Sequence, residues 1–65
     1  MKIHHFRDTD TLYIELRTAA VSETRDLDES TQVDLDAAGQ ACAITLEPAG
    51  ERADLGALDY RQVAA

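Results

Sequence analysis

Three short stretches of this chain alternate apolar and polar side chains with a period of two, which limits the folds that the chain can adopt. Aliphatic side chains recur at every second position within residues 11–17, 31–36 and 41–47. This spacing places them on one face of a half-buried β-strand. Residues 2–6 predict a further strand, and residues 21–27 look extended but break the alternation, which favours an edge position or a bulge. The sequence therefore predicts a mainly β (β-rich α+β) fold, an antiparallel meander of four or five short strands.

The segments between these stretches have the residue types of turns. Residues 7–10, RDTD, predict a loop, because Asp and Thr side chains bond nearby backbone groups. Residues 37–40 predict a hairpin turn in which Gly39 is free to adopt a positive φ. Pro48 ends the last strand and permits at most one short helix after it. The sequence does not decide whether residues 48–63 form a helix, a strand or a tail.

The apolar positions make a small core. With 65 residues, the chain is expected to form one small domain over residues 1–65. A core of this size rarely supplies more than ~3–5 kcal/mol, and Cys42 is the only cysteine, so no disulfide within the chain can add to it. We therefore expect self-association, most simply as a homodimer. The expected core comprises Ile3, Leu12, Ile14, Leu16, Val33, Leu35, Ile44 and Leu46, with Phe6 and Cys42 at its margin.

The charge of the chain restricts its partners. Thirteen acidic and six basic residues give a net charge of −7. Nucleic acid and anionic membranes repel such a chain, so neither is an expected partner, whereas basic proteins and metal cations are favoured. The same charge is also explained by solubility alone. A lone cysteine and a polar start, MKIHHF, fit a reducing cytoplasm.

Few residues have the pattern of a chemical site. Asp8, Asp10 and His5 are weak candidates for a metal site, but two nearby carboxylates fall short of a calcium ligand set, and a strand-initiating turn explains the aspartates. Residues 34–39, DLDAAG, mimic the start of an EF-hand loop, yet predicted strands flank them. Cys42 lies in an apolar context typical of a small buried side chain. No catalytic constellation and no cofactor site follows, so we expect a protein that is not an enzyme.

Two functions remain after these exclusions. The first is a non-enzymatic protein-interaction module that self-associates, with Tyr13, Leu58 and Tyr60 as candidate interface residues. The alternative is a small metal- or ligand-binding protein that uses acidic turn residues and a histidine. Thermal melts with EDTA or an added divalent cation separate the two, because a ligand that binds only the folded state raises stability.

Several motifs resemble a known family. The stretches KIHHF, DTDTLYIEL, ETRDLDES, VDLDAAGQ and AITLEPAGERADL occur in the order and spacing of DUF2283, a family of small bacterial and archaeal proteins of unknown function. The most specific part is D-T-L-Y-I-x-L at residues 10–16. The resemblance implies a small single domain. Because some members are encoded beside small toxin-like proteins, it also implies an antitoxin-like partner role.

Overall fold

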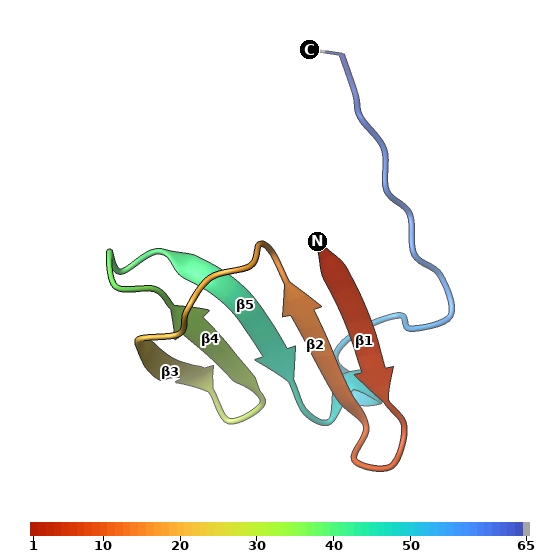
Figure 1. Cartoon of the computed structure of the whole chain (residues 1–65). Coiled ribbons are helices and arrows are strands. Elements are labelled where there is room, and N and C mark those ends of the chain that lie inside the picture. Colours follow the sequence, from red (N-terminus) through yellow and green to blue (C-terminus); the bar gives the residue numbers. More distant parts are fainter. Residues whose placement is uncertain (65) are drawn as a thin grey trace.

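The computed structural model describes residues 1–64 and shows one antiparallel sheet (Figure 1). Its five strands are β1 (Lys2–Phe6), β2 (Thr11–Glu15), β3 (Glu23–Asp28), β4 (Thr31–Leu35) and β5 (Ala41–Leu46). A single 3₁₀ turn, η1 (Ala49–Glu51), follows Pro48. The predicted fold class is confirmed. The last residue of the expected domain, Ala65, lies outside the described residues.

The strand order departs from a simple meander. The order across the sheet is β1-β2-β5-β4-β3, so the connection after β2 crosses to the far edge and the chain returns through β4 and β5 (Figure 1). Backbone bonds fix this crossover at both ends, from Leu16 N–H to Cys42 O and from Ser22 N–H to Leu35 O, both 2.8 Å long. The physical reason is burial: β2 and β5 contain the most apolar side chains and therefore pair at the centre.

The two edge strands are exposed along their whole length. In β3 the expected irregularity is present, because the register with β4 shifts between Asp26 and Asp28. Leu27, the residue within this bulge, is 65% exposed. A bulge and charged side chains both discourage an edge strand from pairing with another chain.

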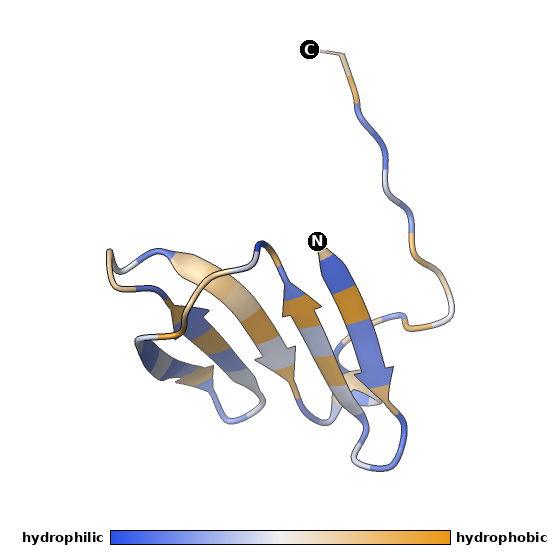
Figure 2. Cartoon of the chain, in the orientation of Figure 1, coloured by the Kyte–Doolittle hydropathy of each residue, from blue (hydrophilic) through white to orange (hydrophobic). Residues whose placement is uncertain are grey.

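One face of the sheet is apolar and the other polar, as the alternating bands along the strands indicate (Figure 2). Residues opposite one another in an antiparallel pair share a face, and the registers align Ile3, Ile14, Ile44 and Val33 in one row across four strands. Leu12 and Leu46 are paired on the same face. We call this surface the apolar face. The polar face carries His4, Tyr13, Thr45 and Gln32 in a corresponding row.

The core is smaller than expected from the sequence. Leu12 and Leu35 are buried, and Ile14, Val33, Ile44 and Leu46 are half-buried. The prediction was wrong for Ile3 and Leu16, which are 42% and 38% exposed because Ile3 lies on an edge strand and Leu16 lies just beyond the end of β2. At the predicted margin, Phe6 is exposed and Cys42 is buried. Two unexpected residues, Ala43 and Ala49, are also buried.

The chain after η1 forms no further helix or strand up to residue 64. Residues 53–58 lie beside the apolar face of β1 and β2, where they line a hollow together with Ile3, Leu12 and Ile14. Beyond them the chain runs away from the sheet (Figure 1). No helix in the described part of the chain is long and apolar enough to cross a membrane.

Candidate functional site

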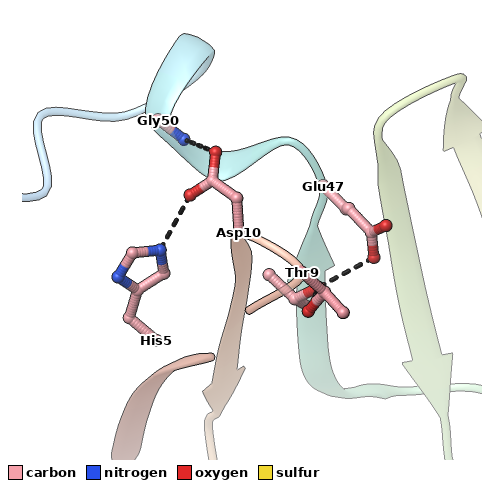
Figure 3. A network of polar contacts seen from close by, with 6 residues as sticks. His5, Thr9, Asp10, Glu47 and Gly50 are labelled. Atoms are coloured by element: carbon pink, nitrogen blue, oxygen red, sulfur yellow. Dashed lines mark hydrogen bonds and ion pairs between the residues drawn. The ribbon is translucent and has the colours of Figure 1, made fainter. Parts of the chain in front are cut away.

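A network of polar contacts joins three segments of the chain at the turn between β1 and β2 (Figure 3). Asp10 is its central residue and has a positive φ of 53°, a conformation that Asp tolerates better than most residues. Its Oδ1 accepts a hydrogen bond from His5 Nε2 over 2.8 Å, and its Oδ2 accepts one from Gly50 N–H over 2.9 Å. Its backbone oxygen accepts a third, from Ala49 N–H over 2.7 Å. Asp10 therefore attaches η1 to the β1–β2 turn.

A second set of contacts ties the same turn to the end of β5. The Thr11 hydroxyl donates to Glu47 Oε2 over 2.8 Å, and the hydroxyl oxygens of Thr9 and Thr11 lie 2.7 Å apart. Figure 3 shows Thr9 and Glu47 beside the Asp10 contacts. The DTDT stretch is thus a turn whose side chains bond to residues about 36–40 positions later.

The electrostatics of the network centre on one carboxylate. The hydrogen bond from His5, and then the one from Gly50 N–H, hold the pKa of Asp10 below its usual value. Both bonds favour the charged form of the carboxylate. A histidine–carboxylate pair activates a nucleophile when the histidine also bonds to that nucleophile's hydroxyl or thiol. In this network the hydroxyls of Thr9 and Thr11 bond instead to one another and to Glu47. Cys42 is buried on β5 and donates to Asp34 O. The arrangement fits a structural tether.

The metal-site candidates are brought together in part. His5 and Asp10 are in contact, whereas Asp8 lies exposed in the same turn. Within residues 1–64, no three His, Cys, Asp or Glu side chains gather as a metal site would require. The EF-hand-like stretch is a hairpin turn, in which Asp36 accepts bonds from Ala38 N–H and Gln40 N–H and Gly39 has a φ of 79°.

Sequence reasoning missed the two residues that meet Asp10 from η1. Gly50 has no side chain, and a Cβ there would lie 3.1 Å from Asp10 Oδ2. Ala49 is completely buried against this turn. The available clue was the run of small residues directly after Pro48, which permits a close approach of two backbones.

The effect of Asp10→Asn tests the tether. Asn tolerates the same backbone conformation, so the substitution leaves the turn geometry in place and removes the charge and one of the two side-chain acceptors that His5 and Gly50 bond. Because the folded pKa of Asp10 is lowered, its contribution to stability is present above the unfolded pKa of about 3.9 and is lost as the pH falls through the folded value. We expect Asp10→Asn to lower the Tm at neutral pH, with the difference from wild type shrinking below pH ~4.

Asp8→Asn is the matched control for this measurement, because Asp8 lies in the same turn with an exposed side chain. We expect its melting curve to follow that of wild type at every pH, as for most surface changes. A Tm difference for Asp10→Asn that is absent at neutral pH, or that persists unchanged in acid, would contradict the tether.

The polar face carries an acidic hollow. It has a volume of about 340 Å³ and is lined by the carboxylates of Asp26, Asp28, Glu29 and Glu47. The bond from Ser30 N–H, and then those from the side chains of Thr31 and Arg52, lower the pKa of Asp28, and Arg52 Nη2 donates to Asp28 Oδ2 over 3.1 Å. The hollow therefore presents negative charge at neutral pH.

The three interface candidates lie in different places. Tyr13 is half-buried on the polar face, where burial raises the pKa of its hydroxyl. Leu58 and Tyr60 are 77% and 72% exposed. Leu58 lines the hollow on the apolar side, which has a volume of about 270 Å³, and Tyr60 lines a neighbouring hollow with Met1 and Ile3. Tyr13 and the other two candidates therefore do not share a surface.

Comparison with known proteins identifies a family. The model of a family described as a protein of unknown function (DUF2283) matches residues 2–49. These residues include all five strands and end at the buried Ala49. No curated protein matches the chain, and no solved structure matches it.

Proposed function

The chain belongs to the DUF2283 family of proteins of unknown function, and from its structure we propose that it is a non-enzymatic interaction module that self-associates through its apolar face. One observation supports this proposal. Six aliphatic side chains share one face of a single sheet, and no helix or second sheet in residues 1–64 is packed over it. Domains usually bury such a face against a second layer.

The size of the chain strengthens the proposal. A domain of about 60 residues buries only ~60% of the surface of its unfolded chain. Here the buried hydrophobic residues are Leu12, Leu35, Cys42, Ala43 and Ala49, so only two of them are large. Covering the apolar face with a second copy adds the missing layer, and the simplest closed arrangement is a two-fold dimer.

We also propose a partner of opposite charge. The acidic hollow on the polar face and the net charge of −7 both favour a basic protein, which the antitoxin-like role would require. The polar face stays available for this partner when the apolar face is covered. The free, buried thiol of Cys42 supports a location in a reducing cytoplasm.

Ile3→Lys tests the role of the apolar face. Ile3 is 42% exposed and lies on an edge strand, so a lysine can direct its charge into water in a single copy. In a dimer that covers the apolar face, the same charge is buried without a partner, which is costly. We expect Ile3→Lys to fold as a monomer, measured by circular dichroism and sedimentation.

His4→Lys is the matched control, since it adds the same side chain to the opposite face of β1. We expect this variant to associate as wild type does. Equal association by both variants would show that the apolar face is not the contact.

A further inference from the structure

The C-terminal arm, residues 58–64, has apolar side chains that stay mostly exposed, although Leu58 and Tyr60 line hollows beside Ile3. Leu58, Tyr60 and Val63 are 77%, 72% and 81% exposed. The arm forms no helix or strand, and it runs away from the sheet (Figure 1). If the arm docks as an extended strand, its side chains alternate, with Leu58 and Tyr60 on one side and Val63 on the other.

The hollow on the apolar face fits such side chains. Its volume is about 270 Å³, and its walls include Ile3, Leu12 and Ile14 on the sheet. Protein interiors contain few voids larger than a water molecule, so a hollow of this size on an apolar surface favours an occupant. A cavity of about 150 Å³ accommodates a benzene ring, so this hollow has room for a tyrosine ring.

Charge and length both allow the arm to reach a second copy. Asp59 and Arg61 form an ion pair at 2.9 Å and are the only charged side chains in residues 58–64, so the arm has no net side-chain charge. Its side chains therefore add nothing to the repulsion between two chains of charge −7. Seven extended residues span up to about 23 Å, which exceeds the roughly 19 Å across five paired strands.

We propose that the arm of one copy docks on the apolar face of a second copy, with Tyr60 entering the hollow beside the Leu58 that already lines it, and that the second arm does so in return. This inference rests on the proposed self-association and names its contact. Leu58 already lines the hollow of its own copy, so its own Tyr60 would enter only if the chain reversed at Asp59. Residues 57–64 include no Gly or Pro, the residues that favour such a reversal.

Tyr60→Ala in the full chain measures the contribution of the arm. A buried aromatic anchor at an interface is typically a dominant residue, so we expect the dimer dissociation constant to rise by about 30-fold or more. Val63→Ala is the matched control on the other side of the arm, and we expect it to associate as wild type does. Unchanged association of Tyr60→Ala, in a wild type that dimerises, would overturn arm docking and leave the proposed function standing.

A mixing experiment distinguishes exchange between copies from folding back. One copy has the substitutions Cys42→Ala and Gln62→Cys, carries a spin label at position 62 and contains no ¹⁵N. It is mixed with ¹⁵N-labelled protein that has no spin label. We expect selective broadening of the Leu12 and Ile14 amide signals of the ¹⁵N-labelled copy. Dimers without this broadening would overturn the exchange, whereas a wild type that stays monomeric would overturn the proposed function itself.

Discussion

Leu12→Ala is expected to unfold most of the protein at room temperature. Leu12 lies on the interior strand β2, is 8% exposed and is paired with Leu46 on the apolar face. Removing a buried leucine side chain costs ~2–5 kcal/mol, through lost burial and the cavity that remains. A domain of this size has only ~3–5 kcal/mol of stability from its core. The measurement is the far-ultraviolet circular dichroism signal during urea and thermal denaturation.

Leu27→Ala is the control for this substitution. Leu27 lies in the bulge of the edge strand β3 and is 65% exposed. Its truncation removes little buried surface, so we expect a change within about 0.5 kcal/mol. A Leu12→Ala protein with the denaturation midpoint of wild type would contradict the assignment of Leu12 to the core.

Ala49→Leu is expected to produce the second large effect. Ala49 is completely buried, and its N–H donates to Asp10 O over 2.7 Å, so the backbones of η1 and the β1–β2 turn lie in close contact. A larger side chain must displace one of them, and overpacking of this kind typically costs ~1–3 kcal/mol. We expect a lower urea midpoint and, because η1 moves, loss of the pH-dependent stability that Asp10 supplies.

The same substitution at an exposed alanine provides the comparison. Ala57 lies beyond η1 and is exposed, so Ala57→Leu adds the same atoms without overpacking. We expect its midpoint to stay at the wild-type value. If Ala49→Leu retained both the midpoint and the pH dependence of wild type, the close contact between η1 and the turn would be refuted.

The strands could be predicted from the sequence, but their order could not. Alternation with period two marks a strand and the face on which each side chain lies, and it located β2, β4 and β5 to within two residues. It contains no information on which strands pair. The crossover that brings β5 beside β2 follows from burying the two most apolar strands together, which depends on the whole sheet.

The polar network could be predicted only in its local part. The residue types of Asp8 and Asp10 predicted a turn, and the structure places both there. The contacts of Asp10 with Ala49 and Gly50 join residues about 40 positions apart, and spacing in the sequence does not reveal them. The exposure of Ile3 could not be predicted either, because it depends on the position of β1 at the edge of the sheet.

Self-association through the apolar face is tested by light scattering across a range of protein concentrations. We expect wild-type protein at micromolar concentration to have the mass of two chains, and its Tm to rise with concentration because association stabilises only the folded state. A mass of one chain at every concentration, with a Tm independent of concentration, would contradict self-association through this face.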